Sequence, residues 1–279
     1  MAKTLQTIKS RIRSISATGK ITGAMELVAI SKLRRQRNLM EENQEYANSI
    51  AEIVRDILRN SAMIDNQYLV ENETDDKQVV IVFCSDLGLC GGYNVNMQNA
   101  VEEYLNKNQQ LILIGSRIYP QLKAEGYNLN DEIIYSDETD YEYLSDLTDE
   151  LLHKFVNKEI TSIQILYTKF INTMTYQPSL VRILPVSHNS EEAEYEIIYE
   201  PDANTILDDL VPLYVRAFIY HCYLESVTSE QSSRRIAMEN ANDNAEKLIE
   251  ELTLEYNQAR QSNITQEITE IIAAAEALQ

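Results

Sequence analysis

The feature that most constrains the fold is a pair of long stretches, one at each end of the chain, that are almost free of glycine and proline. Residues 213–279 contain neither, and residues 1–58 contain only Gly19 and Gly23. All five prolines lie between these two stretches. Because Gly and Pro are the main breakers of regular structure, each end is predicted to form one long helix, with conventional turns confined to the middle.

Both ends also carry the apolar spacing of a coiled coil, in which apolar residues recur at alternating steps of three and four. These positions are Leu5, Ile8, Ile12, Ile15, Tyr46, Ile50, Ile53 and Ile57 near the start, and Ala245, Ile249, Leu252, Tyr256, Ala259, Ile264, Ile268, Ile271, Ala275 and Leu278 near the finish. At 1.5 Å per residue the two helices would span roughly 85 and 100 Å, more than the width of a globular domain. We therefore expect them to pack on each other as an antiparallel coiled coil.

The middle of the chain alternates strand-like and helix-like segments, which predicts a mainly parallel sheet with helices on its faces. The strand-like runs lie at 79–83, 111–114, 133–135 and 163–167, the helical spacings near 93–107, 116–125 and 143–157, and a final hairpin or edge at 180–184 and 195–199. The predicted fold class is α/β plus a long coiled coil. Its domains are an N-terminal shaft helix at 1–58, a globular α/β domain at 70–205 and a C-terminal shaft helix at 208–279.

The net charge of the chain disfavours several kinds of partner. The chain has 24 Lys and Arg against 44 Asp and Glu, a net charge of −20, which disfavours binding to nucleic acids or to anionic lipid surfaces. Its three cysteines are too few for a disulfide framework, and no signal peptide or run of about eighteen apolar residues is visible. We expect a soluble chain in a reducing compartment, without direct membrane insertion.

The charge is unevenly distributed. Residues 1–37 hold nine Lys and Arg and a single acid, Glu26, whereas residues 65–209 hold 27 acids and 8 bases. A basic helix on an acidic protein suggests an acidic partner, although the alternative, a helix face that is merely solvated, stays open.

No segment predicts an active site. The string SDLGLCGGY at 85–93 follows the first predicted strand, where a phosphate-binding loop would lie, but it lacks both the Gly-Lys-Ser/Thr ending and the Gly-x-Gly-x-x-Gly spacing. A tight strand-to-helix turn that needs glycine is the better interpretation. Cys84 and Cys90 have no histidine at ligand spacing, and neither a nucleophile elbow nor a catalytic cluster is present. We therefore predict no catalytic residue, no cofactor and no metal.

Three strings, in order along the chain, carry a resemblance to a known family. The first comprises IKSRIRSI at 8–15, KITGAMELVA at 20–29 and SKLRR at 31–35. The second is SDLGLCGGYN at 85–94, and the third runs from the AMENANDNA of 237–245 through LTLEYNQARQ at 252–261 to residue 278. Together they resemble the gamma subunit of F-type ATP synthases over the whole length of the chain.

The resemblance implies a central rotor shaft that is not itself an enzyme. Its terminal helices form the antiparallel coiled coil, and its middle is a Rossmann-like domain without a nucleotide. The implied partners are the alpha and beta subunits of the catalytic hexamer, the epsilon subunit and the c-subunit membrane ring. The implied location is the cytoplasmic side of a bacterial cell membrane, as a peripheral part of the complex.

The resemblance also implies which residues contact the beta subunits. Arg260 and Gln261 match an Arg-Gln pair that meets a loop of beta, with Thr265 nearby, and Met25 matches a methionine that faces an acidic lever of beta. Arg234 matches a coupling arginine just before the AMENANDNA string, and Lys32 and Arg34 are further implied contacts. Arg35, beside Arg34 on the basic helix, is predicted to face the same acidic lever. Leu87 stands where the family usually has Lys or Arg, so an ionic contact from that loop is not expected.

Two other functions stay open at this stage. The first is the shaft of a specialised rotary ATPase that hydrolyses ATP without a standard membrane ring. The second, from another class, is a coiled-coil scaffold with a small Rossmann domain, which a phosphate loop or a catalytic cluster within 79–210 would have favoured. The sequence distinguishes neither synthase from hydrolase nor proton from sodium coupling.

Overall fold

The computed structural model describes residues 5–60, 64, 66–69, 77–186 and 199–277. It divides into two compact units, a shaft unit (residues 1–29 and 235–279) and a sheet unit (residues 30–234). Helices α1 (Leu5–Asn60) and α5 (Ala203–Ala277) contribute to both units, and each unit is described by itself. Lys3, His188, Leu278 and most of the strand expected at 195–199 lie outside the described residues.

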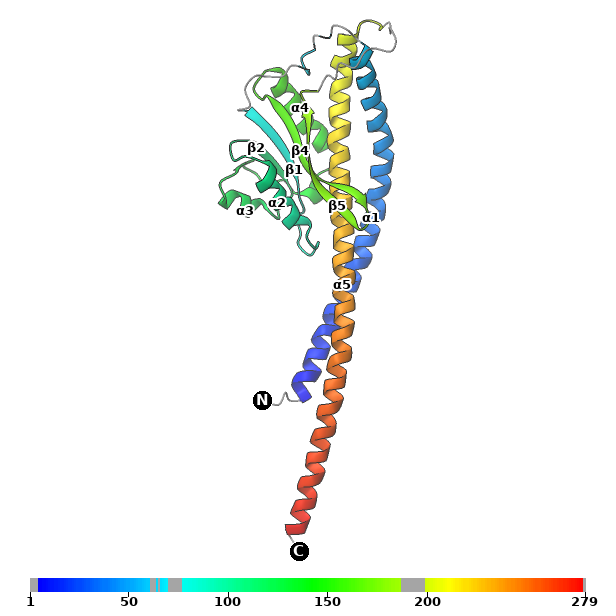
Figure 1. Ribbon diagram of the computed structural model, residues 1–279, viewed down its shortest axis with the longest axis vertical. Helices are drawn as coiled ribbons and strands as arrows, with labels where there is room; N and C mark the ends of the chain where they lie inside the picture. The colour runs from blue at the N-terminus through cyan, green and yellow to red at the C-terminus, as the bar shows by residue number, and fades with distance from the viewer. Residues whose placement is uncertain (1–4, 61–63, 65, 70–76, 187–198, 278–279) are drawn as a thin grey trace. The chain divides into compact units, whose positions relative to one another are not determined.

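The sheet unit is built on five strands in the order β3-β2-β1-β4-β5. Strands β1, β2, β3 and β4 run parallel, and β5 returns antiparallel beside β4. Their bounds are β1 Gln78–Phe83, β2 Gln110–Ile114, β3 Asn128–Leu129, β4 Ser162–Asn172 and β5 Thr175–Leu184. The helices between the parallel strands are α2 (Tyr93–Tyr104), α3 (Tyr119–Ala124) and α4 (Tyr141–Val156). This is the Rossmann-like arrangement that the sequence predicts (Figure 1).

The two faces of the sheet have separate cores because successive side chains of a strand point to opposite faces. Val80 and Val82 of β1 belong to the cluster that packs under α2 and α3. Val79, Ile81 and Phe83 belong to the larger cluster, which α4 and the sheet-unit parts of α1 and α5 cover. The shaft helices are therefore part of this core, which includes residues of α1 from Leu39 to Leu58 and residues of α5 from Ala203 to Val227.

Among the described residues, the strand predicted at 133–135 is not formed, and the segment at 180–184 belongs to β5, the edge strand beside β4. Residues 133–135, predicted as a strand, make only an isolated bridge between Ile134 and Ile114, and β3 lies earlier, at Asn128–Leu129.

Gly115, directly after β2, has φ +113°, and a Cβ there would lie 2.3 Å from the carbonyl oxygen of Cys84. Only glycine allows β1 and β2 to approach each other so closely at this turn.

The buried stripe of α1 within the sheet unit also differs from the prediction. Ile50 and Ile57 are buried as expected, but Tyr46 and Ile53 are exposed, and Ala47 and Val54 take the buried positions. The prediction favoured the larger apolar residue of each adjacent pair, whereas the helix turns the smaller one toward α5 and the sheet. Close packing of α1 selects small residues at these contacts.

Helix α5 begins ten residues before the glycine-free and proline-free stretch. The Asp202 side chain accepts the Thr205 N–H at 3.0 Å, the geometry of an N-cap, and this hydrogen bond lowers the pKa of the Asp202 carboxyl. Pro212 lies inside the helix without ending it.

In the described part of the chain, no helix combines the length and the hydropathy that crossing a bilayer requires.

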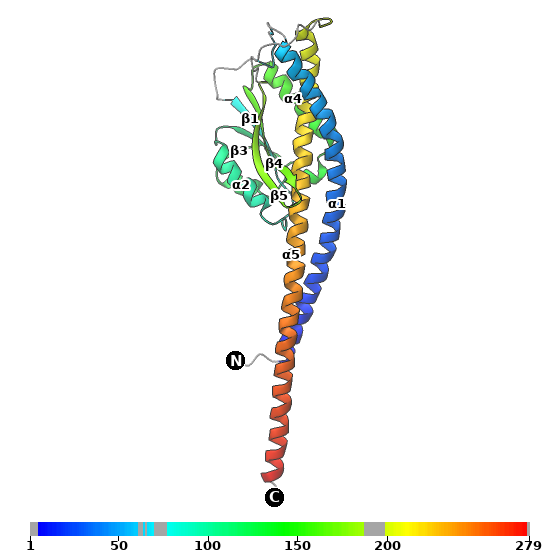
Figure 2. The same ribbon diagram turned by 45° about the vertical axis from the view of Figure 1, so that its right-hand side comes forward.

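In the shaft unit, α1 and α5 run antiparallel, side by side in both views (Figures 1 and 2). A Cβ on Gly19 would lie 3.4 Å from that of Ala245, so the helices approach closely there. The predicted stripe from Ala245 to Ala259 is buried or half-buried and is confirmed. From residue 261 to residue 275, however, every position of α5 is exposed, because the helix extends beyond the N-terminal end of α1.

Candidate functional site

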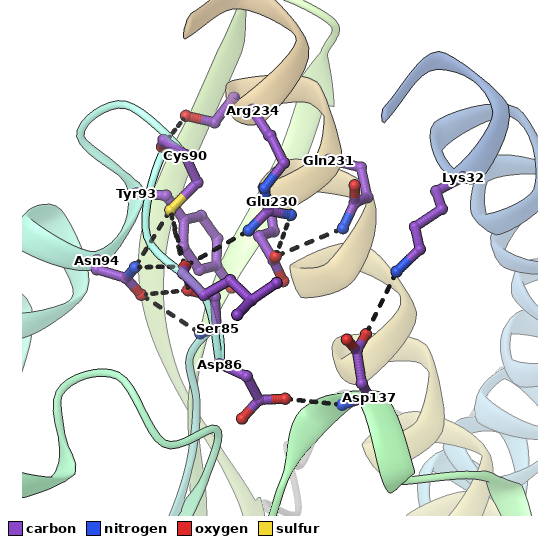
Figure 3. A network of polar contacts seen from close by, with 12 residues as sticks. Lys32, Ser85, Asp86, Cys90, Tyr93, Asn94, Asp137, Glu230, Gln231 and Arg234 are labelled. Carbon is purple, nitrogen blue, oxygen red and sulfur yellow. Dashed lines mark hydrogen bonds and ion pairs between the residues drawn. The ribbon is translucent and has the colours of Figure 1, made fainter. Parts of the chain in front are cut away.

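In the glycine-containing segment that follows β1, the side chains form hydrogen bonds with one another and with the main chain of the segment (Figure 3). The Ser85 hydroxyl lies 2.8 Å from the Leu87 carbonyl oxygen and 2.9 Å from Oδ1 of Asn94. The Asn94 amide in turn donates to the Cys90 sulfur at 3.1 Å. These side chains fill the interior of the turn, which accords with a structural strand-to-helix connection.

Two residues of this loop have left-handed backbone conformations. Gly91 has φ +56° and Leu89 has φ +61°, and the latter is costly for a branched side chain. Leu87 is 61% exposed and Leu89 is 64% exposed. The loop thus presents an apolar tip.

The loop is bonded to α5 within the sheet unit. The Ser233 hydroxyl donates to the Cys90 carbonyl at 2.6 Å, and the Tyr93 hydroxyl lies 2.8 Å from that of Ser226. Burial raises the pKa of Tyr93 well above its ordinary value, so this side chain stays a neutral hydrogen-bonding group. The signature loop and the long helix are therefore joined by buried polar contacts.

Arg234 forms a buried ion pair with Glu230, one helical turn earlier. Its guanidinium also donates to the Leu87 carbonyl at 3.4 Å. Burial raises the pKa of Glu230, and the positive charge of Arg234 opposes that rise. A buried pair of this kind is costly to break, because the remaining partner would be left as an uncompensated buried charge.

A small polar pocket lies beside this pair. Asp86 is one of its lining residues, and its carboxylate accepts the N–H groups of Ser116 and Asp137, each at 2.9 Å. Lys32 of α1 reaches the Asp137 carboxylate at 3.6 Å. The lining residues come from α1, the signature loop, the turn at 136–137 and α5: Lys32, Asp86, Leu87, Ser136, Asp137, Glu230, Gln231 and Arg234.

The structure places the predicted partner-binding residues in two groups. In the sheet unit, Lys32, Arg34 and Arg35 are exposed on α1, whereas Arg234 is only 8% exposed and bonded within the chain. In the shaft unit, the exposed residues are Arg260, Gln261 and Thr265, and Met25 is half-buried. The Thr265 hydroxyl donates to the main-chain carbonyl of Gln261 at 2.9 Å.

The basic helix has acidic contacts inside the chain. Lys32 pairs with Asp137, and Arg37 pairs with Glu41 at 2.8 Å. Among the residues that the structure describes, neither Arg34 nor Arg35 has an ion-pair partner. These two arginines are therefore exposed charges of the sheet-unit part of α1 that stay available to another chain.

The three cysteines and His221 are part of the packing. All three cysteines are buried and unpaired, and burial raises the pKa of the Cys84 and Cys222 thiols. Within the described ranges, no three His, Cys, Asp or Glu side chains gather as metal ligands. His221 lies 3.8 Å from Glu225, and burial followed by the charge of Lys169 lowers its pKa.

Sequence reasoning missed the polar face of α5 between residues 226 and 233. Ser226, Ser229, Ser232 and Ser233 are each at most 2% exposed, although serine is usually a surface residue. The missed signal is the string SVTSEQSS, which interrupts the apolar pattern for two helical turns inside an otherwise regular helix.

Comparison with known proteins identifies the family. The chain matches a family profile described as ATP synthase over residues 4–278. It is 36% identical over 277 residues to the ATP synthase gamma chain of Mycoplasma mycoides and 39% identical over 286 residues to that of Mycoplasma mobile, with 98% of each chain covered in both comparisons. The chain belongs to the ATP synthase gamma-chain family. The gamma-subunit assignment made from its sequence is confirmed.

Two further comparisons extend this result. The sodium-ion-specific ATP synthase gamma chain of Acetobacterium woodii is 35% identical over 302 residues, with both chains covered completely. The structure resembles a chain of the Euglena gracilis mitochondrial ATP synthase, with a TM-score of 0.69, 16% identity, and 98% and 94% of the two chains covered. At that identity the structural likeness concerns the fold, and the predicted fold class is confirmed.

Proposed function

We propose that the chain is the central rotor stalk of an F-type ATP synthase. It would couple ATP synthesis or hydrolysis in a hexamer of alpha and beta subunits to rotation of an ion-translocating ring of c subunits. The observation that carries this proposal is the match, along their full length, with relatives named as gamma chains. In this proposal the chain catalyses nothing itself, since the ATP sites belong to the beta subunits.

The exposed end of α5 supports a place inside such a hexamer. Ile264, Ile268 and Ile271 are 46%, 52% and 69% exposed, and the helix has no partner there among the described residues of the chain. An apolar helix face of this kind is stable in water only at a cost, which an apolar sleeve around it removes. Arg260, Gln261 and Thr265 lie at the start of this segment, where their polar groups would meet the beta subunits.

The basic surface of α1 supports contact with an acidic lever of beta. Arg34 and Arg35 are exposed and without an ion pair in the described structure, and Met25 and Lys32 lie on the same helix. Attraction between exposed charges steers a contact without holding it at one angle, as a rotating bearing requires. Arg234 contributes differently in this proposal, by holding the signature loop against α5.

A second candidate is a specialised rotary ATPase with a different membrane part. The observation that favours it is the net charge of −19 over residues 65–209, from 27 acids and 8 bases. That region includes the globular surface expected to meet the epsilon subunit and the c ring, so an unusual charge there suggests unusual partners. In both candidates the chain is a peripheral subunit on the cytoplasmic side of a bacterial membrane.

Reconstitution with the alpha and beta subunits of the same organism tests the proposal. The three chains should form an ATPase in which a bead fixed to the sheet unit turns when ATP is added. A complex that hydrolyses ATP with a stationary bead, or a chain that does not assemble, would contradict the rotor role. Mass spectrometry of the membrane subunits that co-purify with the complex then distinguishes the two candidates, because only the first requires a c ring.

A further inference from the structure

Buried serines follow the apolar part of α5, and stability alone does not explain why polar residues stand at these buried positions. Helix α5 packs against the sheet with apolar residues as far as Cys222 and Leu224, and then continues with polar residues that are equally buried. Apolar contacts are non-directional and tolerate small shifts, whereas a hydrogen bond to a fixed acceptor is satisfied in one arrangement. A polar stretch in a buried interface therefore favours one register over its neighbours.

The acceptors of these serines are mostly main-chain groups. Ser229 donates to the Thr168 carbonyl at 3.1 Å, and the Thr168 N–H donates to the Ser226 hydroxyl at 3.4 Å. The ladder between β1 and β4 ends at Val82 and Leu166, so Thr168 lies just beyond it. Two serines of α5 thus bond both main-chain groups of a residue of β4 that β1 no longer reaches.

The next two serines bond other parts of the sheet unit. Ser232 donates to the Thr173 carbonyl, in the turn between β4 and β5, at 2.6 Å. Ser233 donates to the Cys90 carbonyl and lies 2.8 Å from the Tyr176 hydroxyl of β5. The helix is therefore bonded to a central strand, a hairpin and the signature loop within eight residues.

These contacts lie at the end of the sheet-unit part of α5. The sheet unit ends at Arg234, one residue after Ser233, and α5 continues from there as part of the shaft unit. A torque applied along the helix enters the sheet unit at this end. The first contacts to carry it are the hydrogen bond from Arg234 to the Leu87 carbonyl and, directly after it, the hydrogen bonds of residues 226–233.

We propose that four buried serines fix the axial and rotational register of α5 against the sheet, and so transmit torque between this helix and the sheet. These residues, here called the serine rack, are Ser226, Ser229, Ser232 and Ser233. The proposal rests on the rotor function proposed above and names positioning residues for it. Losing one such hydrogen bond favours slipped arrangements by roughly two- to tenfold, and losing four compounds the effect.

The test uses the assembled complex with a bead on the sheet unit. A cysteine at exposed Glu103 (E103C) provides the attachment point, since the three native cysteines are buried. The variant replaces all four serines by alanine, which retains the helix propensity of α5. The matched control is Thr228→Val, in the same stretch, because Thr228 is fully buried and its hydroxyl has no hydrogen-bond partner among the described residues.

The readout is the angular fluctuation of the bead while rotation is halted, together with the coupling of ATP turnover to rotation. We expect the angular variance to rise about twofold or more in the quadruple variant, with ATP turnover retained, and to stay unchanged in Thr228→Val. Equal variance in the quadruple variant and the parent complex would overturn the proposal. If the quadruple variant does not assemble, the pair Ser229→Ala and Ser233→Ala is measured in the same way, with the same criterion. A parent complex that does not rotate would instead contradict the rotor function itself.

Discussion

Two stretches of the same helix, α5, lie in opposite environments. Between residues 203 and 234 the helix is part of the sheet unit, where Leu207, Val211 and Val215 are at most 1% exposed. Between residues 261 and 275 every position is exposed, including three isoleucines of the predicted apolar stripe. The first stretch uses its side chains to hold the helix in the protein, and the second leaves them available to other chains. The same kind of apolar pattern is therefore buried in the core in the first stretch and exposed on the surface in the second.

The largest difference between the two stretches should appear when a charge is introduced into each. Val215→Asp places a carboxylate in the core of the sheet unit, and we expect the free energy of unfolding to fall by about 4 kcal/mol or more. Ile268→Asp, on the exposed stretch, should leave unfolding of the isolated chain within about 0.5 kcal/mol and weaken assembly with the hexamer. Urea unfolding and size-exclusion assembly measure the two effects. Similar losses of stability would show that the end of α5 is not free in the isolated chain.

The exposed stretch should matter for turnover and not for folding. Replacing Arg260 and Gln261 by alanine removes donors that are exposed in the isolated chain. A charged hydrogen bond contributes about 1.5–3 kcal/mol, so ATP hydrolysis by the assembled complex should slow roughly ten- to a hundredfold. Circular dichroism melting of the isolated chain should stay unchanged. Normal turnover would remove these residues from the coupling role, and a collapsed melting curve would show that they stabilise the coiled coil.

Charge reversal on α1 extends the same comparison to the basic helix. Arg34→Glu with Arg35→Glu should reduce the coupling of ATP turnover to rotation several-fold, because these charges have no ion-pair partner in the described structure. Asp137 is unsuitable as an acidic control, since it pairs with Lys32. Exposed Glu103 and Glu159, each changed to lysine, are better matched. An equal effect of both pairs on coupling would mean that the basic helix is merely solvated.

The smallest expected effect concerns pH and the buried part of α5. The lowered pKa of His221 means that the folded state resists a proton that the unfolded state accepts. Its contribution to stability is therefore present above the ordinary histidine pKa and is lost as pH falls below it. Glu225, beside it, has a raised pKa and acts in the opposite direction, so the comparison must isolate the histidine. Between pH 7 and pH 5, His221→Asn should lose less stability than the parent chain, by a few degrees in melting temperature. An identical pH dependence of the two chains would contradict this assignment.

Much of the fold is readable from the sequence because it depends on local patterns. The distribution of glycine and proline indicates two long helices, and the alternation of apolar runs and helical spacings indicates a covered parallel sheet. Segment 133–135 shows the limit of this reasoning. Its apolar run resembles a strand, but only Ile134 forms a bridge to β2, at Ile114, because β3 pairs with Gln110 and Leu111 and the Asn130 side chain accepts the Leu113 N–H.

The candidate site was predictable only where it is carried by motifs. The signature strings indicated the loop at 85–94 and the exposed residues Arg34, Arg260 and Gln261. They gave no indication that Arg234 is buried against Glu230, or that Asp137 pairs with Lys32. Those contacts join residues whose distance in space no local pattern contains.

By itself, the sequence determined the two helices, the class of the central domain and the family, since each follows from residue types at short spacing or from motifs in order. Only the tertiary structure decided which apolar residues of α1 are buried, that the end of α5 has no partner among the described residues, and that serines 226–233 bond the sheet. The physical reason is that a helix has the same local geometry in water, in a core or beside a strand edge. What a side chain does there depends on which distant backbone groups the fold brings to it.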